Sequence, residues 1–139
     1  MFRRVEKDRI FFDRQATNSV SALSLDVADY RHCILQVATT QSFVGSIFIV
    51  GAIGQARPSF AWTGSSIDAT HDDPYDFIEV VSLRDGTAVD GNTGIELTTS
   101  TDTIRLYEVN INALDWLGVF VTAIKAGAVS IKATIATNS

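Results

Sequence analysis

Two histidines and one cysteine are the residues of this 139-residue sequence whose side chains best suit metal binding or nucleophilic chemistry. A structural zinc site needs about four cysteine or histidine ligands at close spacing, and His32, His71 and Cys33 do not supply them. His71 precedes Asp72, a pair that could orient a general base, but neither a Gly-x-Ser-x-Gly motif nor a phosphate-binding loop accompanies it. The sequence therefore predicts a protein that is not an enzyme and that uses no metal and no cofactor.

Carboxylates gather in two stretches of the chain. Asp68, Asp72, Asp73 and Asp76 are close in sequence, and the segment 90–96 carries oxygen-bearing side chains at positions 90, 92, 93 and 96. Calcium prefers oxygen ligands, but these stretches lack the twelve-residue spacing of an EF-hand. We expect the carboxylates to be solvated turn residues. Paired carboxylates for glycoside hydrolysis stay an open alternative, because their separation depends on the fold.

The formal net charge of −5 is unevenly distributed. Residues 1–14 contain five basic and three acidic side chains, namely Arg3, Arg4, Lys7, Arg9 and Arg14 against Glu6, Asp8 and Asp13. The other residues contain six basic and thirteen acidic side chains. Because an acidic body repels polyanions, the sequence argues against a nucleic-acid partner. The first residues are charged and do not resemble a signal peptide, and the longest apolar run, 47–53, is too short for a membrane span. We therefore expect synthesis in the cytoplasm and no membrane association.

The elements that would position any site are β-strands. Alternating apolar and polar residues predict nine strands, over 9–13, 21–27, 31–39, 42–53, 76–83, 94–98, 103–110, 115–124 and 128–137. Eight or nine strands without a helical period indicate an all-β, single-domain β-sandwich, and the expected form is a jelly roll of about eight antiparallel strands. An immunoglobulin-like sandwich is the nearest alternative, but the cysteine pair of that fold is absent.

Two of the predicted strands are apolar on both faces, which indicates that both of their faces are covered. In 42–53 and 115–124 the positions that point to either side of a pleated sheet are filled mostly by apolar residues or glycine. Such strands lie deep in a sandwich or in a contact between subunits. We expect Trp116 to be a core residue and Cys33 to be a buried, inert thiol.

Two appendages are candidates for contact with a partner. Residues 1–14 are predicted to be an extended N-terminal arm on a domain formed by 15–139, anchored by the basic and apolar side chains of Arg3, Arg4, Ile10, Phe11 and Phe12. The connection 54–75 is about twenty residues long, which is uncommon in a compact domain and often functional. Phe60 and Trp62 in this connection need a surface to cover. They pack either on their own sandwich or on a neighbouring protein.

Parts of the sequence resemble a family of viral proteins. The resemblance is carried by the stretches YRHCILQ (30–36), DFIEVVSLRDG (76–86), DGNTGI (90–95) and RLYEVNINALDWL (105–117). They are similar to small β-sandwich proteins encoded among the head genes of tailed bacteriophages, the cement or decoration proteins. The resemblance extends over about residues 30–137 and consists of diffuse sheet patterns. It implies a jelly roll on the outside of a phage capsid, where the protein would stabilise the shell by bridging major capsid proteins.

The same resemblance implies the partners and the location of the protein. The partners would be the major capsid protein and further copies of the chain itself, as a homodimer or homotrimer at a symmetry axis, and the location would be the surface of the virion. Two alternatives stay open. One is another virion module, such as a tail or head-fibre protein that binds a receptor or carbohydrate. The other is a small β-sandwich hydrolase.

Overall fold

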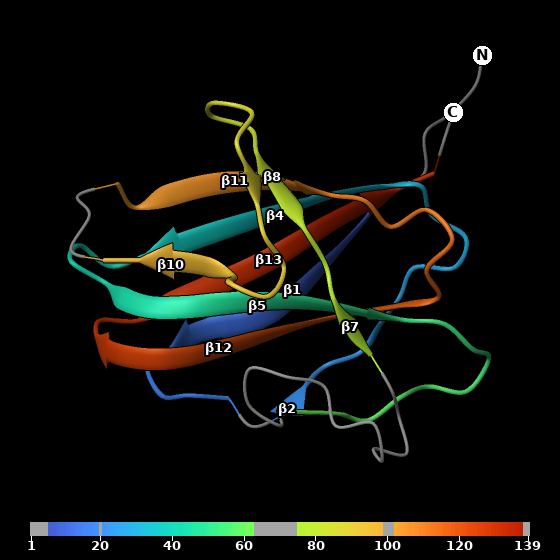
Figure 1. Ribbon diagram of the computed structural model, residues 1–139, viewed down its shortest axis with the longest axis horizontal. Helices are drawn as coiled ribbons and strands as arrows, with labels where there is room; N and C mark the ends of the chain where they lie inside the picture. The colour runs from blue at the N-terminus through green and yellow to red at the C-terminus, as the bar shows by residue number, and fades with distance from the viewer. Residues whose placement is uncertain (1–5, 20, 63–74, 99–101, 138–139) are drawn as a thin grey trace.

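The computed structural model describes residues 6–19, 21–62, 75–98 and 102–137. Within these ranges the chain forms thirteen β-strands, arranged in stacked sheets (Figure 1). None of these residues belongs to a helix that is long and apolar enough to cross a membrane.

The strands form two large sheets and one small one. The first sheet has the order β1 (Glu6–Gln15), β13 (Val129–Ala136), β4 (His32–Thr39), β11 (Ile104–Val109), β8 (Val80–Ser82) and β9 (Ala88–Val89). The second sheet has the order β10 (Ile95–Leu97), β5 (Val44–Ala52), β12 (Trp116–Ala126) and β3 (Leu25–Asp26), with β7 (Asp76–Phe77) paired to β5. The small sheet pairs β2 (Ser21–Ala22) with β6 (Phe60–Ala61).

The strand order is that of a jelly roll. In chain order, β1, β3, β4, β5, β10, β11, β12 and β13 can be counted as strands one to eight. The first sheet then contains the order 1-8-3-6 and the second sheet contains the order 5-4-7-2. This alternation between two packed sheets defines the jelly roll. The predicted all-β sandwich is therefore confirmed, and β6, β7, β8 and β9 are insertions between its fourth and fifth strands.

Every predicted strand coincides with at least one observed strand, and two observed strands were missed. The missed strands, β6 and β9, are each two residues long. A segment of two residues is too short to show an alternating pattern, and only its pairing partner identifies it as a strand. The chain turns from β12 to β13 at residues 127–128, but the two strands pair in different sheets, so the turn does not form a hairpin. Gly127 has a φ of 78°, a left-handed conformation that glycine adopts without strain.

The expected boundary between an arm and a domain at residue 14 requires correction. Residues 6–15 form β1, which pairs with β13 from Glu6 opposite Ala136 to Gln15 opposite Val129. This ten-residue strand is therefore an edge of the first sheet. The reason is the apolar segment within it, because Phe11 is buried in the core between the sheets.

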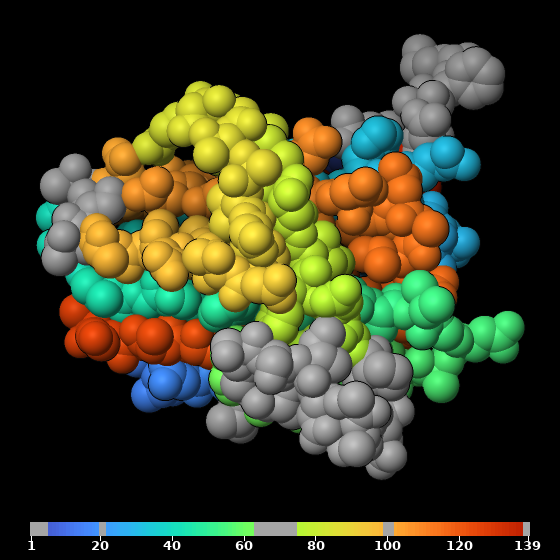
Figure 2. Space-filling view, viewed as in Figure 1, coloured from blue at the N-terminus to red at the C-terminus, as the bar shows by residue number. Residues whose placement is uncertain are grey.

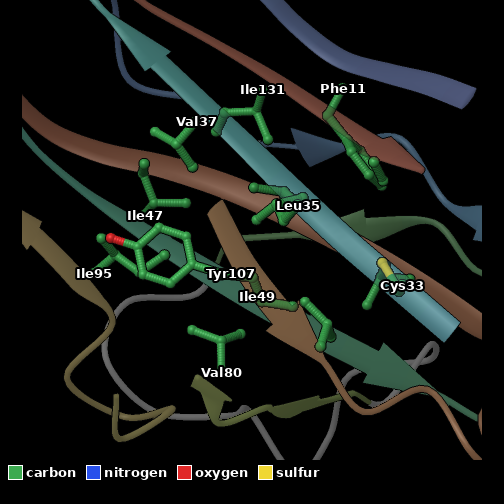
Figure 3. Close-up of a cluster of buried hydrophobic side chains, with 14 of the residues drawn as sticks. Phe11, Cys33, Leu35, Val37, Ile47, Ile49, Val80, Ile95, Tyr107 and Ile131 are labelled. Carbon is green, nitrogen blue, oxygen red and sulfur yellow. The ribbon is translucent and has the colours of Figure 1, made fainter. Parts of the chain in front are cut away.

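The core between the two large sheets contains apolar side chains from both of them. Figure 3 shows Leu35, Val37 and Ile131 from the first sheet facing Ile47 and Ile49 from the second. Cys33 is buried in this inter-sheet core, as the sequence predicted. Burial raises the pKa of the Cys33 thiol from its ordinary value near 9 to about 12, because the thiolate would be poorly solvated there.

A second core explains why β5 and β12 are apolar on both faces. The outward faces of these strands are covered by an aromatic cluster of the same chain, which we call the outer aromatic core. Its buried members are Phe48, Val50, Ala52, Phe60, Tyr75, Trp116 and Phe120. Trp116 is therefore a core residue, as predicted. The second apolar face is buried inside the chain and does not require a subunit contact.

Candidate functional site

The candidate contact residues near the N-terminus have different environments. Arg3 and Arg4 lie outside the described residues. Phe11 is buried in the inter-sheet core, so its assignment as a partner anchor is corrected: it anchors β1 to its own sandwich. Phe12 is half-buried against the same core. Ile10 is 61% exposed on the outer side of β1, and its role in binding a partner stays a prediction.

The aromatic residues of the long connection belong to the outer aromatic core. Phe60 is only 1% exposed, and its ring lies edge-on to Tyr75 with 5.7 Å between ring centroids. Its assignment as a partner anchor is therefore corrected, because it has almost no surface to offer another protein. Trp62 is half-buried between Phe48 and Phe120, at centroid distances of 5.0 and 5.3 Å. A partner contact of the remaining surface of Trp62 stays a prediction.

The first part of this connection is tied firmly to the body. The indole Nε1 of Trp116 donates a hydrogen bond to the Gly54 carbonyl oxygen at 2.9 Å. The Gly54 amide donates in turn to Asp115 Oδ2 at 2.6 Å. The guanidinium of Arg57 lies 4.7 Å from the centre of the Trp116 ring and donates to the Ser24 hydroxyl at 3.0 Å. These contacts hold the segment as it projects from the molecule (Figure 2).

The residues that could have performed chemistry are not gathered into a site in the described part of the chain. No group of three or more histidine, cysteine or acidic residues there could hold a metal ion. His71, Asp68, Asp72 and Asp73 lie outside the described residues. Asp90 has a structural role in its turn, because its carboxylate accepts a hydrogen bond from the Asn92 amide at 2.8 Å.

A polar hollow lies at one end of the first sheet. It has a volume of about 570 Å³ and is lined by backbone and side chains that include Arg31, His32, Glu108, Asn110 and Asn112. The side chain of Asn110 accepts a hydrogen bond from the Asn112 amide at 3.0 Å, so that it shapes the turn after β11. The lining of this hollow is suited to water or polar ligands.

An apolar hollow on the outer side of the first sheet was missed by the sequence analysis. Leu83, Ile104 and Leu106 line it, together with Ser82, Arg84 and Arg105, and its volume is about 290 Å³. These three apolar residues are half of the six large hydrophobic residues that are exposed in the described part of the chain. Alternation could have revealed Ile104 and Leu106, which share one face of a strand opposite Tyr107 and Val109.

One end of this hollow is charged and held in place. Arg84 forms an ion pair with Asp102 at 2.5 Å and also donates to the carbonyl oxygen of Ile104. Asp102 lies 4.0 Å from the guanidinium of Arg105. Because these groups are exposed, the ion pairs contribute little to stability. They fix the direction of the β8–β9 hairpin beside the apolar residues.

Comparison with known proteins identifies the fold. No protein-family model and no curated protein matches the sequence. The SPBc2 prophage-derived protein YomS has a similar structure, with a TM-score of 0.67 and 11% sequence identity over 99% of this chain and 97% of that chain. The PBSX exported protein XepA has a TM-score of 0.66 and 16% identity over 99% of this chain but 39% of that chain. At these identities the likeness establishes a shared architecture.

Proposed function

We propose that this chain is a structural protein of a bacteriophage particle, and that it binds the outside of the capsid and stabilises it by bridging major capsid proteins. The observation that carries the proposal is the likeness to a prophage-derived protein along nearly the whole of both chains. That neighbour, YomS, is derived from a prophage. The stretches that resemble capsid cement proteins support the choice of the capsid among the parts of a virion.

The physical properties of the described domain suit such a role. Two packed cores, one between the sheets and one outside β5 and β12, give a stiff body. The outer side of the first sheet offers exposed apolar residues such as Ile10 and Ile104 for contact with other proteins. In this proposal the protein is not an enzyme, and its partners are proteins of the particle.

Binding alone is enough to stabilise a capsid. A protein that binds the assembled shell more tightly than its separated subunits shifts the equilibrium toward the assembled state by mass action. Copies repeated over a symmetric lattice can add their contributions when one molecule contacts two neighbouring subunits. The protein then needs several contact surfaces on a rigid body and no reacting group.

The proposal is tested by co-sedimentation with purified heads of the phage that encodes the chain. The full-length protein should pellet with expanded, DNA-filled heads at a saturable and fixed ratio to the major capsid protein. The same protein without heads serves as the control for aggregation. Heads that lack the protein should break at lower temperature than heads to which it has been added back.

A result without head binding would contradict the capsid role. Binding to tails, or to carbohydrate of the host surface in a glycan screen, would instead favour the alternative of a tail or fibre module. Since this alternative also uses a rigid β-sandwich, the comparison of heads, tails and glycans in one experiment separates the two roles.

A further inference from the structure

The segment that joins β5 to β6 projects from one end of the sandwich. It comprises residues 53–59, which we call the finger, and Figure 1 shows it in green, extending past the end of β5. All of its residues except Pro58 are exposed. Most of the finger belongs to the long connection, and connections of that length are often functional. Unlike Phe60, which follows it and is buried, the finger has surface to offer a partner.

The finger is held at both ends and near its beginning. β5 pairs with β12 up to Ala52, directly before the finger, and β6 pairs with β2 from Phe60, directly after it. Between these ends, the Gly54 amide donates to the carboxylate of Asp115. The carbonyl oxygen of the same glycine accepts a hydrogen bond from the indole of Trp116. The backbone of the finger is therefore attached to β12 and to the residue before it.

Arg57 makes a further attachment in the second half of the finger. Its guanidinium lies over the ring of Trp116 and donates to both the hydroxyl and the carbonyl oxygen of Ser24. Both anchors are buried residues of the body. Pro58 comes next, and its ring restricts the backbone further. The finger is thus ordered in the free protein, and an ordered contact segment loses less conformational entropy when it binds.

Ile53 is the large apolar side chain that the finger presents to solvent. It is 77% exposed, the largest exposed fraction among the large hydrophobic residues of the described part of the chain. It lies between the last paired residue of β5 and Gly54, whose φ of 128° is rarely adopted by residues with a side chain. Single exposed apolar residues are common on protein surfaces. Ile53 differs from them because the backbone on both sides of it is held in place.

We propose, on the basis of the capsid role proposed above, that the finger is a contact element and that Ile53 inserts into an apolar recess on the major capsid protein. The partner surface must be concave at this point, because a projecting side chain is fully buried only in a recess. Aliphatic or aromatic side chains would line that recess, since burial of the branched side chain of Ile53 in apolar surroundings stabilises the complex.

Binding to purified heads tests this contact. Ile53→Ser should weaken binding of the full-length protein by about tenfold or more, because the serine side chain has little apolar surface to bury. Ile53→Val is the matched control, since it keeps a β-branched apolar side chain, and it should bind nearly as tightly as the wild type. Both variants should unfold at nearly the wild-type temperature by circular dichroism, because Ile53 is exposed in the free protein.

Asp115→Ala tests whether the finger is held in position before it binds. This substitution leaves Ile53 in place but removes the acceptor of the Gly54 amide. In the free protein, the hydrogen exchange of that amide, followed by NMR, should be slow in the wild type and faster in the variant. The variant should bind heads more weakly than the wild type but more tightly than Ile53→Ser.

The possible failures are distinguishable. Wild-type binding to heads that is unchanged by Ile53→Ser would overturn the finger contact and leave the capsid role standing. A wild-type Gly54 amide that exchanges as fast as in an unstructured peptide would overturn the ordered finger, whatever the partner. Absence of wild-type binding to heads would contradict the capsid role itself, and with it the partner named for Ile53.

Discussion

At the scale of single residues, Phe60 packs so closely on Gly118 that this position of the outer aromatic core is the one most sensitive to an added side-chain atom. A Cβ atom on Gly118 would lie 2.5 Å from the Phe60 ring, which is closer than packed carbon atoms can be. Gly118→Ala should therefore lower the free energy of unfolding by about 1–3 kcal/mol. In a Phe60→Leu background the same substitution should cost less, because the smaller side chain leaves room. Urea unfolding of the four proteins measures this coupling.

Phe60 itself tests whether the long connection is part of the fold. Phe60→Ala should lower the free energy of unfolding by about 3–5 kcal/mol, as expected for the loss of a fully buried aromatic ring. Ala56→Gly, in the exposed part of the same connection, is the control and should have a small effect. Normal stability together with lost binding to heads would show that Phe60 contacts a partner after all.

The buried thiol of Cys33 makes the free energy of unfolding depend on pH in the alkaline range. Its pKa is about 12 in the folded protein, whereas the thiol of the unfolded chain ionises near its ordinary value. Above about pH 9 the unfolded state therefore loses a proton that the folded state retains. The stabilising contribution of the neutral thiol is complete below pH 9 and is lost as the pH rises toward 12. Comparison of wild type with Cys33→Ala isolates this contribution, since Tyr107, whose pKa is also raised by burial, is common to both.

At the scale of elements, β1 behaves as a strand of the sandwich and not as an arm. Removal of residues 2–5, which leaves the described strand from Glu6 onward intact, is the control. Removal of residues 2–14 should lower the free energy of unfolding by at least about 3 kcal/mol, since Phe11 and most of the pairing with β13 are lost. Equal stability of the two truncated proteins in thermal unfolding would contradict the assignment of β1 to the sheet.

The elements also show what sequence patterns can and cannot predict. Alternation located β4, β5, β11, β12 and β13 because each is long enough to show its period. It also detected that β5 and β12 are covered on both faces, but not that Phe60 and Tyr75 of the same chain cover them. Which residues cover the outer faces of β5 and β12 depends on contacts between residues that are distant in sequence. For the same reason the hollow between Leu83 and Ile104 could not be predicted, as it forms only when β8 pairs with β11.

At the scale of the whole molecule, the jelly roll has two unlike outer sides. The outer side of β5 and β12 is covered by the outer aromatic core, whereas the outer side of the first sheet carries the exposed apolar residues Ile10 on β1 and Ile104 and Leu106 on β11. A resemblance in sequence was needed to propose a capsid, because the same architecture serves many unrelated functions. The likeness to a prophage-derived protein establishes the fold and does not distinguish the capsid from other parts of a virion.

Saturation of purified phage heads with the full-length protein is the decisive measurement. The capsid role predicts a fixed number of bound molecules for each major capsid protein, located on the outer surface by cryo-electron microscopy, and a higher temperature of head disruption. Absence of bound protein on expanded heads at saturating concentration, with a correctly folded and stable preparation, would contradict it.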